Sequence, residues 1–378
     1  MRIGIVCYPT FGGSGVVATE LGMALAQKGY EVHFITYKPP VRLDLIASGI
    51  HFHQVQIQEY SLFHYQPYEL ALSSRMAQVV EKYKIDILHV HYAIPHAYAA
   101  YMAKQMLAQK GIDVRVVTTL HGTDITLVGS HPNYKTAVEF SINNSDVVTS
   151  VSQSLKDDTF RLFDIKRDIE VVYNFIELEK YAKHPLGAVD CQRKNIAKED
   201  EYILTHISNY RPVKRAKDVV RIFAKVAAIK PAKLLLVGEG PEMVEVKKIA
   251  KELNVYHKIL FLGNSTEVAK ILCYTDVFLL PSKSESFGLA ALEAMAARTP
   301  VISSNTGGLP EVNIHGETGF LSNVGDVEDM AKNTLKLIEN KGVLETFKEN
   351  AQQRAATFQM DAVLPKYEAI YKSLVVPV

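Results

Sequence analysis

The sequence has few of the features that place a protein in an oxidising compartment, in a membrane or on a polyanion. Its three cysteines, Cys7, Cys191 and Cys273, show no spacing typical of a disulfide framework or a zinc ribbon. It carries 42 Lys and Arg against 41 Asp and Glu, and the net charge of +1 predicts no global attraction to nucleic acid or to an anionic membrane. No apolar run approaches the roughly 18 residues of a membrane-spanning helix, so we expect no stable membrane insertion.

The first residues of the chain and its length predict its compartment and its number of domains. Arg2 is followed directly by the strand-like stretch 3–6, so we expect no signal peptide and a soluble, cytoplasmic protein. A length of 378 residues, 48% of them hydrophobic, corresponds to about two globular domains. The sequence leaves the oligomeric state open, a homo-oligomer included.

Short β-branched runs alternate with longer helical stretches through the first half, residues 1–180. Because these runs are nearly continuously apolar, each should be buried on both faces of a parallel sheet. The pattern predicts a doubly wound, Rossmann-like α/β domain. The expected strands are 2–7, 31–36, 51–56, 85–90, 114–120, 147–151 and 169–173.

The alternation stops between about 177 and 200, where charges, Pro185 and Gly187 predict a domain boundary. It restarts in 200–358, which predicts a second Rossmann-like domain with strands at 202–207, 233–237, 259–262, 277–280 and 301–304. In the last stretch, 359–378, an amphipathic helix over 361–374 could complete the second domain or cross back to the first. Ligands of such sheets bind at the carboxyl ends of the strands, so two domains facing across a cleft would use their post-strand loops.

The loop after the first strand carries Gly13-Ser14-Gly15 at the expected start of a helix. Backbone amides at such a start can bind an anion closely, whereas the alternative is a glycine turn needed only for packing. Gly13-x-Gly15-x-x-Ala18 also matches a dinucleotide fingerprint, which needs an acidic residue at the end of the second strand. Tyr37-Lys38 stands there instead, so the sequence disfavours a nicotinamide site.

In the second domain, the loops after the first two strands carry cations and glycines. Arg211 and Lys214 lie in a proline-containing loop where both could bind a diphosphate, while Lys217 lies farther into the helix and should be solvated. Gly238 and Gly240 follow the next strand, and they predict either a second amide-lined anion site or a tight turn.

The most specific pattern runs from Glu285 to Glu293. A strand ends, its loop carries Glu285, and a helix carries Glu293 two turns later, so that both carboxylates could face one ligand. Two glycine-rich motifs follow, Gly307-Gly308-Leu309-Pro310-Glu311 and Gly316-x-x-Gly319-Phe320-Leu321.

This ordered set of motifs resembles the retaining glycosyltransferases of the GT-B fold, in the large family four. The resemblance covers essentially the whole chain and is carried by Arg211 with Lys214, Gly238-x-Gly240-Pro241, Glu285-x7-Glu293 and Gly307-Gly308-x-Pro310-Glu311. More narrowly, the stretches 7–15, 91–97, 120–126 and 173–175 are similar to the members of that family that glycosylate L-malate in bacillithiol biosynthesis. The resemblance implies transfer of N-acetylglucosamine from UDP-N-acetylglucosamine to the hydroxyl of L-malate, the first step of that pathway, with no metal or further cofactor.

The resemblance also implies a catalytic set of Arg211, Lys214, Glu285 and His121. The sequence contains no D-x-D motif, so Arg211 and Lys214 would stabilise the leaving diphosphate in place of a metal. Glu285 would bind sugar hydroxyls near the anomeric carbon, and Glu293 would hold the ribose. His121 would donate to a sugar hydroxyl or share developing positive charge, unless it is structural. The other expected donor-binding positions are Gly13, Ser14, Gly15, Gly238, Gly240, Ser286, Phe287, Gly288 and Leu289.

The acceptor is a dianion at neutral pH and needs donors in the first domain. The amides of the helix start at 13–15, with the Ser14 hydroxyl, could bind one carboxylate. Tyr92 and Thr123, in later post-strand loops, could bind the other. Arg75, on a helix predicted over 67–82, could supply charge, and the alternative for it is a solvated helix cation.

Histidines at His89-x-His91, with His96 nearby, and at His51 and His53 invite a metal proposal. Alternate strand residues point to one face, but neither pair has a cysteine or carboxylate partner in register. The sequence therefore predicts no metal site.

Several alternatives stay open on the sequence. Retention could proceed by double displacement, with Glu285 as the only candidate nucleophile, or by front-face attack. The function could also be that of a UDP-N-acetylglucosamine epimerase, of a family-four transferase with another acceptor, or of a non-catalytic sugar-binding protein. Nucleic acid is not an expected partner.

Overall fold

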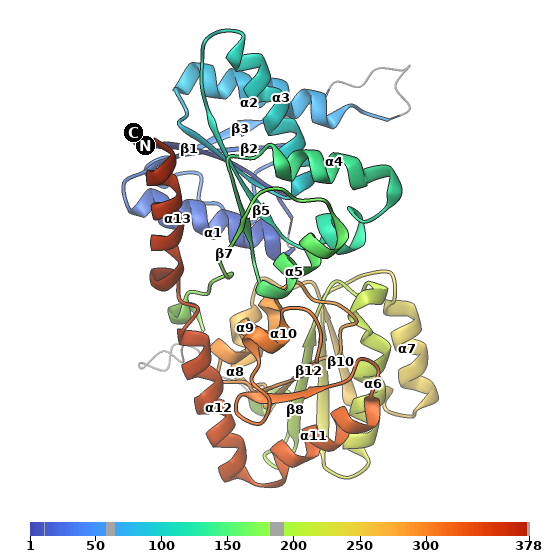
Figure 1. Ribbon diagram of the computed structural model, residues 1–378. Coiled ribbons are helices and arrows are strands. Elements are labelled where there is room, and N and C mark those ends of the chain that lie inside the picture. Colours follow the sequence, from blue (N-terminus) through green and yellow to red (C-terminus); the bar gives the residue numbers. More distant parts are fainter. Residues whose placement is uncertain (11, 58–64, 182–192, 376–378) are drawn as a thin grey trace. The chain divides into compact units, whose positions relative to one another are not determined.

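The computed structural model describes residues 1–10, 12–57, 65–181 and 193–375, and the chain divides into two compact units (Figure 1). Unit 1 comprises Met1–Phe175 and the carboxy-terminal stretch from Met360, and unit 2 comprises Ile176–Gln359. Pro185, Gly187 and Cys191 lie outside the described residues. In the described part, no helix is long and apolar enough to cross a bilayer.

Unit 1 is built on a parallel sheet of seven strands in the order β3-β2-β1-β4-β5-β6-β7. The strands are β1 (Arg2–Val6), β2 (Glu31–Thr36), β3 (Ile50–Gln54), β4 (Ile87–His91), β5 (Arg115–Leu120), β6 (Val147–Ser150) and β7 (Ile169–Val171). The helices are α1 (Gly13–Gln27), α2 (Tyr68–Tyr83), α3 (Tyr98–Ala108), α4 (Pro132–Asn143), α5 (Gln153–Leu162) and α13 (Met360–Val375), with short helical turns η1 (Ala93–Ala97) and η2 (Thr123–Leu127).

Unit 2 repeats this plan with a six-stranded parallel sheet in the order β10-β9-β8-β11-β12-β13. Its strands are β8 (Tyr202–Ile207), β9 (Ala232–Val237), β10 (Ile259–Gly263), β11 (Val277–Leu280), β12 (Val301–Ser304) and β13 (Gly319–Ser322). Its helices are α6 (Ala216–Ala227), α7 (Met243–Glu252), α8 (Val268–Cys273), α9 (Leu289–Ala296), α10 (Leu309–Val312), α11 (Val327–Glu339) and α12 (Lys341–Ala356). Short turns are η3 (Leu178–Lys180), η4 (Arg193–Asn195), η5 (Pro212–Lys214) and η6 (Tyr256–Lys258).

The apolar strands form these sheets because both of their faces are covered. In β9, Leu234 and Leu236 belong to one buried cluster, while Leu235 and Val237 belong to another. A strand buried on both sides gains from apolar residues at every position, not only at alternate ones. The prediction of two doubly wound α/β domains is therefore confirmed. In each sheet the strand order reverses once, between β1 and β4 and between β8 and β11.

The carboxy-terminal helix α13 belongs to unit 1, where it packs against α1 (Figure 1). Side-chain hydrogen bonds attach it: the Tyr371 hydroxyl lies 2.6 Å from His89 Nδ1, the Tyr30 hydroxyl donates to Glu368 Oε1 at 2.8 Å, and Tyr367 hydrogen bonds to Thr119 and Thr149. Of the two placements that the sequence allowed for this helix, the structure has the one that returns to the first half of the chain.

One local feature differs from the sequence-based expectation. Strand β13 lies within a glycine-rich motif and was not predicted; a Cβ at Gly319 would lie 1.9 Å from the Val301 carbonyl oxygen, so only glycine lets this edge strand pair so closely with β12. Cys7 is free and buried, and burial raises its pKa to about 12.

Candidate active-site residues in the two units

In unit 1, the loops after β1, β4 and β5 bring three expected acceptor residues together. The Ser14 hydroxyl, at the start of α1, lies 2.6 Å from the Tyr92 hydroxyl. Tyr92 directly follows β4 with φ of 89°, a conformation that few residues other than glycine adopt, and its hydroxyl also hydrogen bonds to Thr123. These hydroxyls come from positions far apart in the sequence, and they cluster at the carboxyl edge of the sheet.

The amino terminus of α1 lies beside this cluster and has the positive end of its dipole exposed to it. The first turn of α1 contains no acidic residue, so the positive end of the helix dipole is not neutralised there. Gly15 has a packing role, because a Cβ on it would lie 2.4 Å from the Tyr8 carbonyl oxygen and 2.7 Å from that of Thr10. The packing and anion-binding interpretations of this loop are therefore compatible.

His121 directly follows β5, and its Nε2 lies 2.8 Å from His91 Nδ1. Burial lowers the pKa of His121 to about 3, so the ring is neutral near pH 7 and is suited to donating a hydrogen bond rather than carrying charge. His89 has a structural role, because Tyr371 bonds its Nδ1 and the Thr119 hydroxyl lies 2.7 Å from its Nε2. With both nitrogens engaged, His89 cannot bind a metal without breaking these bonds.

Asp124 is a positioning residue to which the sequence analysis gave no role. Its Oδ2 accepts from the Ala93 N–H at 2.8 Å, and its Oδ1 accepts from the N–H groups of Gly122 at 2.9 Å and His121 at 3.2 Å. One carboxylate thus joins the loop after β4 to the loop after β5. Burial raises its pKa to about 6, and the backbone donors oppose that rise. The available signal was a short acidic residue just beyond a post-strand glycine, a common turn arrangement.

Arg75 lies on α2, and its charge acts on His53 of β3. Burial, with the charges of His33 and Arg75 as smaller causes, lowers the pKa of His53 to about 4. Arg75 Nη1 lies 3.4 Å from Gln78 Oε1. Within the described residues, no hydrogen bond joins Arg75 to Ser14 or Tyr92, so its acceptor role stays a prediction.

In unit 2, Lys214 and Glu285 form a direct ion pair. Lys214 Nζ lies 2.6 Å from Glu285 Oε1, which also accepts from the Ser282 hydroxyl at 2.8 Å. The side chains are 23% and 11% exposed, so the pair is only partly screened by water. The Lys283 N–H donates to the Val213 carbonyl at 2.7 Å, which joins the two loops that carry the pair.

The other cations of the loop after β8 differ in their surroundings. Arg211 is exposed and precedes η5, and in the described part of the chain it has no side-chain ion pair. Lys217 was expected to be solvated. Instead, its Nζ lies 2.8 Å from Glu242 Oε1 and forms an ion pair with it. Lys214 is thus the cation of this run that the fold brings to a predicted catalytic carboxylate.

The Gly307-Gly308 motif supports the loop that carries Glu285. A Cβ at Gly307, where φ is 57°, would lie 1.9 Å from the Glu285 carbonyl oxygen, and a Cβ at Gly308 would lie 2.5 Å from that of Ser286. The Gly308 N–H donates to the Glu285 carbonyl at 2.9 Å. The motif therefore positions the carboxylate loop by close backbone contact.

Gly238 and Gly240 let their own loop, after β9, pack closely against the loop after β8. A Cβ on either would lie 1.9 Å from a carbonyl oxygen of the loop after β8, that of Ser208 or that of Asn209 respectively. The Gly238 N–H donates to the Gly263 carbonyl at 2.7 Å, so this amide is already satisfied. For Gly238, this geometry favours the tight-turn interpretation over direct binding of an anion by its N–H.

Glu293 lies on α9 and is half-buried, and its Oε1 accepts from the Tyr181 hydroxyl at 2.9 Å. Gly288, with φ of 97°, precedes the helix, whose first amides have no partner within the helix itself. Phe287 is 2% exposed and packs against Phe358 with ring centres 5.7 Å apart. Phe287 can thus offer a ligand only its backbone.

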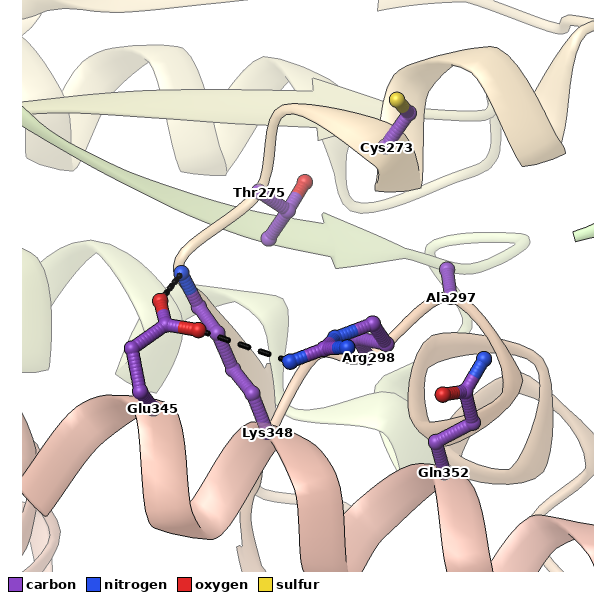
Figure 2. A pocket seen from close by; sticks show the side chains of 7 residues that line it. All are labelled: Cys273, Thr275, Ala297, Arg298, Glu345, Lys348 and Gln352. Atoms are coloured by element: carbon purple, nitrogen blue, oxygen red, sulfur yellow. Dashed lines mark hydrogen bonds and ion pairs between the residues drawn. The ribbon is translucent and has the colours of Figure 1, made fainter. Parts of the chain in front are cut away.

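A pocket of unit 2 lies at one edge of its sheet, and Figure 2 shows the residues that line it. Thr275 precedes β11 and Arg298 precedes β12, so this is the amino-terminal edge. Ligands of such sheets bind at the carboxyl edge, so we do not assign this pocket to the active site. It is lined by Cys273, Thr275, Ala297, Arg298, Glu345, Lys348 and Gln352.

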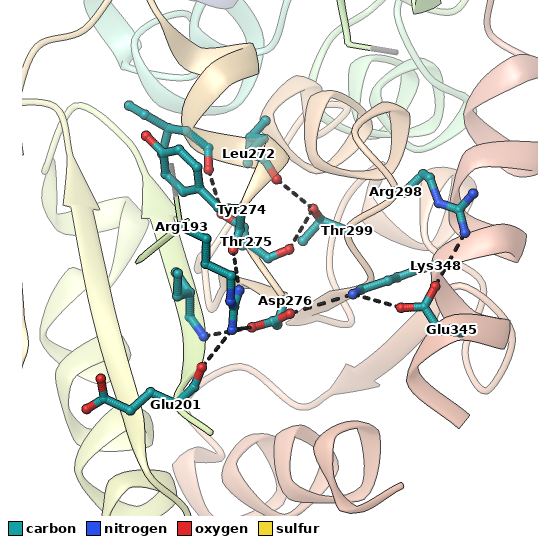
Figure 3. Close-up of polar contacts among 12 residues, drawn as sticks. Arg193, Glu201, Leu272, Tyr274, Thr275, Asp276, Arg298, Thr299, Glu345 and Lys348 are labelled. Atoms are coloured by element: carbon teal, nitrogen blue, oxygen red, sulfur yellow. Dashed lines mark hydrogen bonds and ion pairs between the residues drawn. The ribbon is translucent and has the colours of Figure 1, made fainter. Parts of the chain in front are cut away.

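An ion-pair network explains the polar character of this edge (Figure 3). Arg193 Nη2 lies 2.8 Å from Asp276 Oδ2, which also accepts from the Ile203 N–H at 2.9 Å. Lys348 Nζ lies 3.6 Å from Asp276 Oδ1 and 3.1 Å from Glu345 Oε1. The network links η4, the start of β8 and α12, a structural role.

Comparison with known proteins identifies the family to which the sequence is similar. Residues 11–180 match the family described as Glycosyltransferase Family 4, and residues 190–354 match that described as Glycosyl transferases group 1. An N-acetyl-alpha-D-glucosaminyl L-malate synthase of Bacillus anthracis is 46% identical over 372 residues, 98% of this chain and 96% of the relative.

Two solved structures are similar over almost all of the chain. A sucrose-phosphate synthase of Thermosynechococcus elongatus covers 99% of this chain and 99% of its own, with a TM-score of 0.81 at 20% identity. An Anabaena protein solved in complex with UDP and glucose covers 99% of this chain and 100% of its own, with a TM-score of 0.81 at 19% identity. These likenesses show that the chain shares their fold.

Proposed function

The chain belongs to the family-four glycosyltransferases, and we propose that it transfers N-acetylglucosamine from UDP-N-acetylglucosamine to the hydroxyl of L-malate, with retention of the α configuration. The 46% identical relative supports this choice of substrates, because its name contains both an N-acetylglucosaminyl group and L-malate. The product enters bacillithiol biosynthesis as its first intermediate. We further propose that the reaction takes place in the cytoplasm.

The contact between Lys214 and Glu285 is the observation that carries the donor half of this proposal. Departure of UDP builds negative charge on the diphosphate, which a positioned ammonium stabilises most in the transition state. Lys214 Nζ is held 2.6 Å from Glu285 Oε1, so its position is set before the donor binds. Arg211, exposed in the same loop, supplies the second positive charge, and this pair acts in place of a metal.

The surroundings of Glu285 favour front-face attack over double displacement. Its Oε1 already accepts from Lys214 and from Ser282, and these donors lower the nucleophilicity of that oxygen. Glu285 then acts by holding Lys214 and by binding sugar hydroxyls. In a front-face reaction, a leaving phosphate oxygen takes the proton of the attacking malate hydroxyl.

The remaining donor contacts come from α9 and from His121. Glu293 accepts the ribose hydroxyls, and the amides at Ser286, Gly288 and Leu289 offer donors to phosphate or sugar oxygens. The neutral imidazole of His121 donates to a sugar hydroxyl.

The acceptor binds to the cluster in unit 1. A carboxylate of malate lies at the amides that begin α1 and accepts from the Ser14 hydroxyl. The Tyr92 and Thr123 hydroxyls bind the rest of the molecule, and Arg75 contributes positive charge to the region. Because Ser14 and Tyr92 already hydrogen bond to each other, the hydroxyl cluster is formed before malate arrives.

The experiment that tests this function is product analysis of the purified protein with UDP-N-acetylglucosamine, with and without L-malate. We expect UDP and a glycosylated malate only when malate is present. Formation of UDP-N-acetylmannosamine without an acceptor would instead identify an epimerase. Binding of an intact donor that malate does not convert would indicate a non-catalytic sugar-binding protein.

A further inference from the structure

Four polar side chains share one face of the sheet of unit 1, on the neighbouring strands β2 and β3. Glu31 and His33 alternate along β2, and His51 and His53 alternate along β3. The register pairs His33 with His51, and the two strands are parallel. Residues two apart on a strand point to the same side, so these side chains form a compact group.

Three of these side chains converge on a small volume. Glu31 Oε1 lies 3.1 Å from His33 Nε2 and 3.5 Å from His51 Nε2, and the three atoms all lie within 4.8 Å of one another. In a tetrahedral zinc site, with ligand bonds of about 2.0 to 2.1 Å, neighbouring ligand atoms are about 3.3 to 3.5 Å apart. The two distances to Glu31 already match such an edge, and His51 is half-exposed and can turn to complete it.

The second histidine of β3 orients the buried ligand. His33 Nδ1 lies 2.8 Å from His53 Nε2, and the Tyr83 ring of α2 packs against both, with ring centres 5.0 and 4.8 Å away. When His33 Nδ1–H donates to His53, His33 Nε2 presents its lone pair toward Glu31 and His51. Ligand histidines are commonly oriented by such a bond through their other nitrogen.

We propose that Glu31, His33 and His51 bind a Zn²⁺ ion, with water completing its coordination. Imidazole and carboxylate are suitable donors for this ion. On the sequence alone, His51 and His53 have no carboxylate partner in register, which disfavoured a metal there; the fold supplies that carboxylate from β2. Glu31 begins β2, so the site lies at the amino-terminal end of the strands, and its ion ties the edge strand β3 to β2.

The test is titration of the full-length, untagged protein, first treated with EDTA and dialysed, with Zn²⁺ by calorimetry. We expect one ion per chain and a rise in melting temperature that EDTA reverses. Glu31→Gln and His51→Asn, both at half-exposed positions, should weaken binding by about tenfold or more. His257→Asn, an exposed histidine of unit 2, is the matched control and should bind as the wild type does.

His53→Asn tests the orienting bond, and its affinity should fall by about 10- to 100-fold although it contributes no ligand atom. The proposal is overturned if the wild type binds no Zn²⁺, if Glu31→Gln and His51→Asn bind with wild-type affinity, or if His53→Asn leaves the affinity unchanged. These experiments measure metal binding and not sugar transfer. Their result is therefore independent of the result of the activity assay.

Discussion

At the residue scale, Lys214 carries the positive charge that the fold places closest to a predicted catalytic group. Lys214→Ala should lower kcat by roughly 100-fold, while the KM for the UDP sugar changes much less, because the charge it meets grows toward the transition state. Steady-state kinetics at saturating malate measure both values. Lys217→Ala, which removes a cation of the same run that pairs with Glu242, is the matched control and should keep wild-type kcat. An unchanged kcat in Lys214→Ala would remove this lysine from the catalytic set.

Glu293 tests the nucleotide half of the site. Glu293→Gln keeps the shape of the side chain but removes charge-assisted hydrogen bonds to the ribose, so UDP binding should weaken by about 1.5 to 3 kcal/mol. Calorimetric titration with UDP measures the change. Tyr181→Phe removes one hydrogen-bond partner of Glu293 and should alter UDP affinity less. An affinity of Glu293→Gln within twofold of the wild type would show that Glu293 does not contact the ribose.

Ser14 and Arg75 test the acceptor half. Ser14→Ala and Arg75→Ala should each raise the KM for malate and leave binding of the UDP sugar nearly unchanged, because both changes remove a donor or charge from the proposed dianion site. The larger effect is expected for Ser14, whose hydroxyl is held 2.6 Å from that of Tyr92. Michaelis constants for malate, with separate titrations of the UDP sugar, measure the two effects. Equal loss of both substrates, or of neither, would place the acceptor elsewhere.

At the element scale, the active-site loops are held by backbone contacts that only glycine permits. Gly307→Ala places a Cβ 1.9 Å from the Glu285 carbonyl oxygen, so the loop that carries Glu285 must shift, and both kcat and stability should fall. Gly316→Ala is the matched control, because φ is 81° there but nothing lies within 4 Å of the added Cβ. Its cost should be limited to about 1 to 2 kcal/mol of left-handed backbone strain.

Urea unfolding and kcat together check this prediction. Gly307→Ala should lose more stability than Gly316→Ala, and it should lose activity even at temperatures where it is fully folded. Equal stability losses in the two variants would show that the loop accommodates the Cβ without moving.

The strands and helices followed well from the sequence, because continuous apolar runs have one stable arrangement, a parallel sheet covered on both faces. Most expected strands appear within a few residues of their predicted bounds. Strand β13 could not be predicted from the sequence. Its Gly319 permits close approach to β12, but a glycine weakens the pattern that is typical of a strand.

At the scale of the whole molecule, buried histidines make stability depend on pH. Burial lowers the pKa values of His89 and His121 to about 3 and of His96 and His206 to about 4. Unfolded, each would titrate near its ordinary value of about 6.5. Below that pH the unfolded chain therefore takes up protons that the folded chain does not, and stability should fall as the pH falls from 6.5 toward 4.

The melting temperature between pH 7.5 and pH 5 checks this dependence. Each such histidine contributes a loss of up to about 1.4 kcal/mol per pH unit below 6.5. Asp124, whose pKa is raised to about 6, acts in the opposite direction as a single group. A melting temperature that stays constant across this range would contradict the burial of neutral imidazoles.

How much of the site the sequence could predict depends on distance along the chain. Motifs such as Glu285 to Glu293 are local, so their pattern was visible, whereas Lys214 and Glu285 are 71 residues apart and Ser14 and Tyr92 are 78 apart. Resemblance suggested the first grouping and position in the post-strand loops suggested the second, but the contacts themselves depend on the fold. The role of Asp124 could not be predicted, because its three backbone partners lie on two loops that only the folded sheet brings together.

We propose that L-malate accepts the sugar through its hydroxyl. The most direct measurement is the rate of UDP release from UDP-N-acetylglucosamine with a panel of acids: L-malate, D-malate, other 2-hydroxy acids and succinate, which has two carboxylates but no hydroxyl. We predict fast release with L-malate, slower release with its enantiomer and the other hydroxy acids, and none above background with succinate. Release at the same rate with every acid, or with none added, would contradict the assignment of malate as the acceptor.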